Sequence, residues 1–365
     1  MRLIPTSMLK EGAELAKPIY DCYGRVLVQK NMKLTKNMIS RLQVGGVTYV
    51  YIRDEYTEDI IVEPLIEEEY RREAIMKIRN VFQSFQPEDI HKSTYLLDSS
   101  ANTVYDVAQD LITELDKKQE AIQFLSDILV VDDYVFTHSL NVAMYTLVLG
   151  KKLGLKEKQM ESLGVGALLH DIGKILIPSH ILNKPTQLSD EEFELVKAHT
   201  EYGFDILRRQ DQFPSVVAHC AYQHHERIDG SGYPRQLKGN EIHQFGKIIG
   251  IADVFDAMTS NRVYRDAMLP HDAMEVLYGG AAIKFDKNMV EQFKKTIALY
   301  PNGITVSLSD GRKGIVIRQH PHLFHRQVIR IVEEDGQEVA PYDIDLSKVL
   351  NVMIHDTEQF NVTIK

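Results

Sequence analysis

Histidine and aspartate side chains recur through the middle of the chain, each in or directly after an apolar segment of helical spacing. A polar side chain in such a place needs a partner, and a metal ion would supply one. Imidazole and carboxylate ligands together suit iron, manganese or zinc. The candidate ligands are His138, His170, Asp171, His199, His224, His225 and Asp253.

These seven side chains suffice to hold two ions and to leave open coordination positions on both. A water molecule held between two cations loses a proton near neutral pH and becomes a nucleophile for phosphorus. The cations also offset charge that builds on the phosphoryl oxygens, so no covalent enzyme intermediate is required. No G-x-S-x-G, Walker A or GxGxxG motif in the sequence indicates a competing chemistry.

Basic and aromatic residues near these ligands favour an anionic substrate. Lys174 lies one helical turn beyond His170, where its ammonium could bind a phosphate or assist the leaving oxygen. Arg262 and Arg265 share one helical face and could grip a second phosphate or a guanine edge. Tyr233 lies in the turn-rich segment DGSGYP and could stack on a base or bind phosphate.

Each of these residues also has an ordinary structural interpretation. Lys174 could be a solvated helix residue, Tyr233 a packed ring, and the two arginines partners of Asp256 or Asp266. Asp256 itself could orient a ligand from behind it. The remaining histidines of interest are interpreted as structural or as part of a surface loop, and they are His180, His219, His243, His271, His320, His322 and His325.

The motifs HDIGK, HHERxDGSGYP and IADxFDAMTSxRxYR are long and specific, and they occur in this order between His138 and Arg265. This run resembles the HD-GYP branch of the HD phosphohydrolase superfamily. The resemblance implies a phosphodiesterase that opens the ring of cyclic di-GMP to linear pGpG, and in some members continues to GMP. It also implies two divalent metal ions, iron or manganese.

The resemblance further implies how the ligands divide. His138, His170 and Asp253 would hold one ion, Asp171 would bridge both, and the other ion would be held by His199, His224 and His225. Lys174, Tyr233, Arg262 and Arg265 would bind the substrate, with His170, Asp171 and Lys174 taking part in catalysis. Members with a third ion have a glutamate four residues before the first histidine, where this chain has Tyr134, so we expect two ions.

Other functions stay open at this point. The chain could be a cyclic-dinucleotide receptor with little turnover, or a phosphodiesterase for another cyclic dinucleotide. A di-iron oxygenase is also conceivable, but Lys174, Arg262 and Arg265 argue against it because they suit phosphate.

The elements that must position these residues suggest a multi-domain protein. We expect an all-α, HD-type helical catalytic domain over residues 63–300, with its core motifs in 132–290. Strand-like runs and turn signals predict a small α+β module over 1–62 and a small β module over 301–365. The acidic stretch 63–69 is expected to serve as a connector.

Composition limits the class of protein. The chain has 365 residues, of which 44% are hydrophobic and 26% charged, which is typical of a folded globular protein. Its formal charge of -10 gives no reason to expect DNA as a partner, and no apolar stretch is long enough for membrane insertion. With Cys22 and Cys220 far apart, we expect a cytoplasmic protein, with a homodimer or a signalling-protein partner left open.

Overall fold

A helical unit between residues 66 and 296 and a β-rich unit made from both terminal segments make up the fold. The computed structural model describes residues 1–20, 25–60, 62, 66–85, 94–117, 134–184, 186–260, 267–320, 323 and 326–357. The secondary structure confirms the predicted order of a small α+β segment, a helical domain and a β segment. The exact boundaries at 62 and 300 stay predictions.

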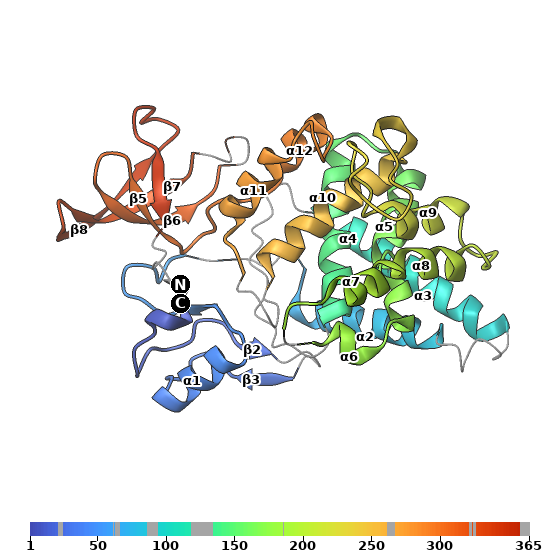
Figure 1. The fold of residues 1–365 in the computed structure, drawn as a ribbon. Coiled ribbons are helices and arrows are strands. Elements are labelled where there is room, and N and C mark those ends of the chain that lie inside the picture. Colours follow the sequence, from blue (N-terminus) through green and yellow to red (C-terminus); the bar gives the residue numbers. More distant parts are fainter. Residues whose placement is uncertain are drawn as a thin grey trace. The chain divides into compact units, whose positions relative to one another are not determined.

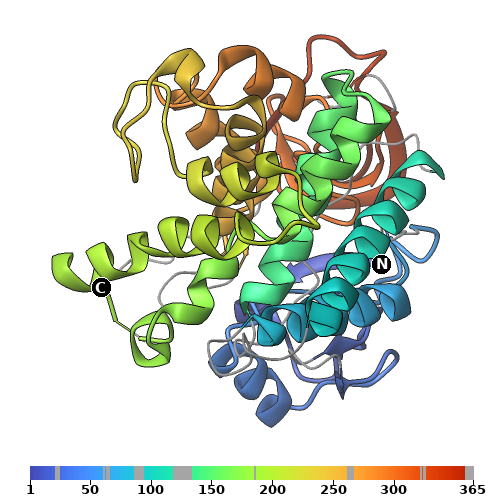
Figure 2. The same ribbon diagram turned by 90° about the vertical axis from the view of Figure 1, so that its right-hand side faces the viewer.

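The helical unit has two deeply buried helices at its centre. The α4 helix packs against α2, α3, α5, α10 and α12, and α10 packs against α4, α5, α9 and α11 (Figures 1 and 2). Polar groups on these two helices must therefore find partners inside the protein. The helices are α2 (Glu68–Ser84), α3 (Thr94–Lys117), α4 (Tyr134–Lys152), α5 (Glu157–Leu168), η2 (Ile172–Leu176), α6 (Ser179–Leu182), α7 (Asp190–Lys197), α8 (His199–Leu207), α9 (Ser215–Gln223), η3 (Gly239–Glu241), α10 (Gln244–Thr259), α11 (Pro270–Gly279) and α12 (Lys287–Lys294).

The apolar spacing of Phe193, Val196, Phe204 and Leu207 predicts one helix over residues 189–209, and the structure forms two. Ser189 followed three residues later by Glu192 predicts a capping box, and the structure contains it: Ser189 Oγ accepts from Glu192 N at 3.2 Å, and a Glu192 carboxylate oxygen accepts from Ser189 N at 2.7 Å. The helix then breaks at Ala198, and α8 begins at His199. Phe193 and Phe204 therefore do not share one continuous helical face, and the Phe193 ring on α7 is 45% exposed.

The amino-terminal segment contains short strands and one helix, as its sequence predicts. The pairs β1 (Arg2–Pro5) with β4 (Tyr49–Ile52) and β2 (Ile19–Tyr20) with β3 (Val26–Val28) are antiparallel, and η1 (Thr6–Met8) follows β1. Thr35 is a residue type that favours helix N-caps, and its Oγ1 accepts from Met38 N at the start of α1 (Lys36–Val44). The Gly45-Gly46 pair predicts the end of this helix, and α1 ends at Gly45.

The carboxy-terminal segment forms a five-stranded antiparallel sheet in the order β8-β7-β6-β5-β9. The Asp335-Gly336 pair is a hairpin turn signal, and it joins β7 to β8 with positive φ at both residues, as a two-residue type I′ turn requires. The strands are β5 (Thr305–Leu308), β6 (Lys313–Arg318), β7 (Val328–Glu334), β8 (Gln337–Asp345) and β9 (Ile354–Thr357).

The two terminal segments pack together within the β-rich unit. Leu3 N donates to Gly303 O at 2.9 Å, and Arg330 forms ion pairs with Asp59 at 2.6 Å and Asp343 at 2.8 Å. The hydrogen bonds that Arg330 donates to these carboxylates raise its pKa, so its charge persists. One guanidinium therefore joins the loop after β4 to strands β7 and β8.

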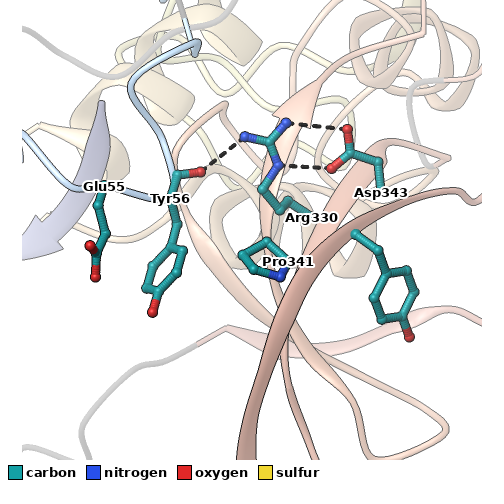
Figure 3. A pocket seen from close by; sticks show the side chains of 6 residues that line it. Glu55, Tyr56, Arg330, Pro341 and Asp343 are labelled. Carbon is teal, nitrogen blue, oxygen red and sulfur yellow. Dashed lines mark hydrogen bonds and ion pairs between the residues drawn. The ribbon is translucent and has the colours of Figure 1, made fainter.

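Beside Arg330 the same unit has a hollow of about 350 Å³ (Figure 3). Its lining combines residues of both terminal segments, namely Glu55, Tyr56, Arg330, Pro341, Tyr342 and Asp343. Among the described residues, no helix has the length and apolar character needed to cross a membrane.

The packing of the terminal segments generates a prediction about cooperativity. Leu15 is fully buried in the amino-terminal core, so we expect Leu15→Ala to lower the stability of the β-rich unit by about 2–5 kcal/mol. Hydrogen exchange should then accelerate in β6 and β7 as well as in β1 and β4. Val44→Ala, at a site 88% exposed, is the matched control and should change neither. Faster exchange confined to the amino-terminal segment would contradict one cooperative unit.

Candidate metal centre

The ligand candidates come from separate elements and meet in the interior of the helical unit. The α4 helix contributes His138, the turn after α5 contributes His170 and Asp171, and α10 contributes Asp253. His199 begins α8, and His224 and His225 follow α9. The structure thus brings together all seven side chains singled out from the sequence.

Two groups of ligand atoms share one carboxylate. His138, His170 and Asp171 each offer an atom within 4.8 Å of the others, and so do Asp171, His199, His224 and His225. Asp171 Oδ2 lies 3.4 Å from His170 Nε2, and Oδ1 lies 3.3 Å from His199 Nε2. Each oxygen of Asp171 therefore faces a different group.

Asp253 lies between the two groups. Its Oδ1 is 3.1 Å from His138 Nε2, and its Oδ2 is 3.6 Å from His225 Nδ1. Both groups consequently have a carboxylate oxygen besides those of Asp171.

Helix ends orient three of the imidazoles. The Nδ1 atoms of His170, His199 and His224 lie 2.7 Å, 2.6 Å and 3.1 Å from backbone oxygens three or four residues earlier, in the last turns of α5, α7 and α9. Carbonyls in the last turn of a helix lack a partner within the helix, so each can accept a proton from Nδ1. This leaves the Nε2 lone pair of each ring directed at Asp171, as metal ligation requires.

His138 is oriented differently, by a side chain. Its Nδ1 lies 2.7 Å from Asp256 Oδ2, and the other oxygen of Asp256 accepts from Asn141 Nδ2 at 2.9 Å and from Ser260 Oγ at 3.2 Å. The interpretation of Asp256 as a residue that orients a candidate ligand from behind is therefore the one that the geometry bears out.

The electrostatics of the site favour the binding of cations. Burial opposes ionisation of both carboxyl groups, but Lys174 and His170 hold the pKa of Asp171 well below its usual range, and the neighbouring imidazoles do the same for Asp253. Burial lowers the pKa of His199 to about 4 and takes those of His224 and His225 well below 6.5. Ionised carboxylates and neutral imidazoles are the states that bind metal.

His138 titrates differently in the absence of an ion. Burial lowers its pKa, but the hydrogen bonds to Asp253 and Asp256 outweigh this effect and raise the pKa to about 9. A cation between His138 Nε2 and Asp253 would take the place of that proton.

Two buried ligand atoms support the fit of this site to metal ions. Among the described residues, His170 Nε2 and Asp171 Oδ1 are buried and have no hydrogen-bond partner. Buried polar atoms rarely remain without one, and both atoms point at the centre of the cluster. The donor set of imidazole and carboxylate fits iron, manganese or zinc.

Close packing at two glycines brings the ligand segments together. A Cβ on Gly173 would lie 2.0 Å from His199 O, and a Cβ on Gly250 would lie 2.6 Å from His224 O. Any larger residue would push η2 away from α8, or α10 away from the end of α9. Gly173 of HDIGK and Gly250 before IAD therefore set the distance between the segments that carry the candidate ligands.

Lys174 and Tyr233 also lie at the cluster. Lys174 Nζ contacts Asp171 Oδ2 at 2.5 Å and the side chain is 19% exposed, so it is more than a solvated helix residue. The Tyr233 ring packs 4.6 Å from the His225 ring, centroid to centroid. Both residues border the candidate ligands.

Other predicted residues fall elsewhere. Arg262, Arg265 and Asp266 lie outside the described residues, as do His322 and His325. Tyr134 begins α4, but its side chain lies outside the described part. Three other histidines contact residues outside the cluster: His243 accepts from Phe245 N, His271 lies 3.2 Å from Asp272, and His320 lies 2.9 Å from Asp345.

Sequence reasoning missed Asn141 and Glu226. Both are buried, and Glu226 accepts hydrogen bonds from Arg235 N and Leu237 N, which holds the loop that contains Tyr233. The available signal for Asn141 was a polar residue three positions after His138 on an apolar helix face.

Residues 108–289 match the family model of the HD domain. A cyclic di-GMP phosphodiesterase from Pseudomonas aeruginosa, PA4108, is 35% identical over 219 residues, which cover 58% of this chain and 52% of the relative. A cyclic di-GMP phosphodiesterase from Thermotoga maritima is 34% identical over 243 residues, which cover 65% of each chain.

A third relative has a different named substrate. The 3'3'-cGAMP-specific phosphodiesterase 3 of Vibrio cholerae is 37% identical over 172 residues, which cover 47% of this chain and 37% of the relative. The chain therefore spans less than two thirds of the length of each of these relatives.

The contact at Gly173 generates a prediction about assembly of the cluster. Gly173→Ala should displace η2 from α8, lower the free energy of unfolding of the helical unit by about 1–3 kcal/mol and weaken Mn²⁺ binding. Thermal melting and Mn²⁺ titration of the full chain would measure both effects. The control is Gly279→Ala, because nothing lies within 4 Å of a Cβ at that position. Equal behaviour of the two variants would contradict the role of the Gly173 contact.

Proposed function

We propose that this chain, whose residues 108–289 match the HD domain model, is a metal-dependent phosphodiesterase that hydrolyses cyclic di-GMP to linear pGpG, with further cleavage to GMP left open. The observation that carries the proposal is the pair of ligand groups that share Asp171. Two relatives named as cyclic di-GMP phosphodiesterases support it.

In this proposal the chain holds two divalent ions, iron or manganese. His138, His170 and Asp253 would bind one ion and His199, His224 and His225 the other, with one oxygen of Asp171 on each. When bound, the ions would acidify a water molecule and offset charge on the phosphoryl oxygens.

The remaining residues would bind and orient the substrate. Lys174 is placed to pair with a phosphoryl oxygen or the leaving oxygen, because its ammonium lies beside the shared carboxylate and is partly exposed. The Tyr233 ring, packed on His225, would border the substrate on the side of the second group. Arg262 and Arg265 are assigned to the second phosphate or a guanine edge on their sequence pattern alone.

The identity of the cyclic dinucleotide has a second candidate. The relative from Vibrio cholerae is named for 3'3'-cGAMP, which differs from cyclic di-GMP in one base. The proposed phosphate chemistry is the same for both molecules, so only the base contacts would distinguish them.

The main test is turnover by metal-loaded protein. Anaerobically purified full chain with measured metal content should convert cyclic di-GMP to pGpG, as followed by chromatography, with 3'3'-cGAMP as the competing substrate. His170→Ala should lose one ion and nearly all turnover, since it removes a ligand beside the shared carboxylate. His180→Ala, outside the cluster, is the control.

Three other outcomes would change the proposal. Tight nucleotide binding without turnover under both Mn and Fe loading would indicate a receptor. Faster cleavage of 3'3'-cGAMP would change the substrate but keep the reaction. No binding and no turnover of either dinucleotide would refute the proposal.

The role of Lys174 generates a separate prediction. Lys174→Met keeps the aliphatic stem and removes the charge, so we expect kcat to fall about 100- to 1000-fold while both ions stay bound. Lys151→Met removes an exposed lysine of α4 that pairs with Asp116, and it should leave kcat unchanged. Unchanged kcat in Lys174→Met would instead make this lysine a structural partner of Asp171.

A further inference from the structure

A buried line of hydrogen bonds connects α2 to the candidate ligand His138. Arg71 Nη2 donates to Asn141 Oδ1 at 3.2 Å, and Asn141 Nδ2 donates to Asp256 Oδ1 at 2.9 Å. Asp256 Oδ2 then meets His138 Nδ1 at 2.7 Å. Arg71 is 5% exposed, Asn141 2%, and Asp256 and His138 1% each, so water competes little for these bonds.

The chemistry of the end groups fixes the direction of every bond in this line. A guanidinium can only donate, and an ionised carboxylate can only accept. Asn141 must therefore turn its oxygen to Arg71 and its nitrogen to Asp256. His138 must in turn donate from Nδ1, which leaves Nε2 as the atom that faces Asp171 and Asp253.

Asparagine suits its position for a specific reason. The residue at 141 has to accept on one side and donate on the other, through a short planar group. Aspartate would bring a second carboxylate against Asp256, and leucine would offer neither bond. The line therefore depends on the residue type at 141.

This arrangement sets His138 apart from the imidazoles held by backbone carbonyls. The Nδ1 atoms of His170, His199 and His224 find their partners in the last turns of their own preceding helices. Of these four imidazoles, only that of His138 is held by side chains, namely Asp256 and, behind it, Asn141 and Arg71. A change in the line should thus act on one group of ligands and spare the other.

We propose that Arg71 and Asn141 are positioning residues that, through Asp256, hold His138 in the tautomer and orientation needed by one of the two ions. The inference rests on the proposed metal centre. It assigns no direct contact with ion or substrate to Arg71 or Asn141.

The test is Mn²⁺ titration of the metal-free full chain, with sites counted and affinities fitted separately. In Asn141→Leu we expect one site to weaken about 10- to 100-fold and the other to keep its affinity. Thr146→Val is the matched control, because Thr146 is a fully buried polar residue on the same helix and outside the line. It should keep both affinities.

A second pair of variants guards against a folding defect in Asn141→Leu. Arg71→Met removes the donor at the start of the line and should weaken the same single site, whereas Arg71→Lys keeps a donor and should restore its affinity toward that of the unmodified chain. Equal loss at both sites, or no loss at either, would overturn the proposal.

Failure of this inference is distinguishable from failure of the proposed function. If the unmodified chain binds two Mn²⁺ ions but cleaves no cyclic dinucleotide, the function fails and the selective effect of Asn141→Leu still stands. If the chain cleaves cyclic di-GMP and Asn141→Leu retains both affinities, the positioning role fails alone.

Discussion

The carboxylate of Asp171 is 1% exposed, and its burial as an anion is the constraint around which the helical unit is arranged. An unpaired charge in such a place would cost many kcal/mol, so the protein must surround it with positive or polarisable groups. Lys174 supplies one positive charge, and the imidazoles of His170 and His199 lie on other sides of the carboxylate, where they can hold cations against it. Each of them needs an element that ends or turns at the right place, which explains why helix ends converge there.

The local features that build this arrangement could be predicted from the sequence. Polar residues directly after apolar helical segments identified His170 and His224, and the Ser189 capping box identified the start of α7. Such signals depend on a few neighbouring residues, so they do not require knowledge of the rest of the fold. Their assignment as ligands stays a prediction, although the geometry places them together.

Non-local features could not be derived in the same way. The break at Ala198 places His199 at the start of α8, but a continuous apolar pattern gives no sign of it. The buried interaction of Asn141 depends on α2 and α10, which are distant in sequence. Likewise, the hydrogen bond from Leu3 N to Gly303 O joins segments from opposite ends of the chain. The strand and turn signals predict two terminal modules, but they do not show that the modules form one unit.

The two ways of orienting an imidazole place different constraints on the amino-acid sequence. A backbone carbonyl in the last turn of a helix is supplied by any residue that remains helical, so the bonds made by Ala167, Val196 and Cys220 place no demand on those side chains. The support of His138 requires a matched set of side chains at positions 71, 141 and 256. Across related sequences, these three positions should therefore change together or stay fixed, whereas the carbonyl acceptors impose no such requirement on the side chains of their own residues.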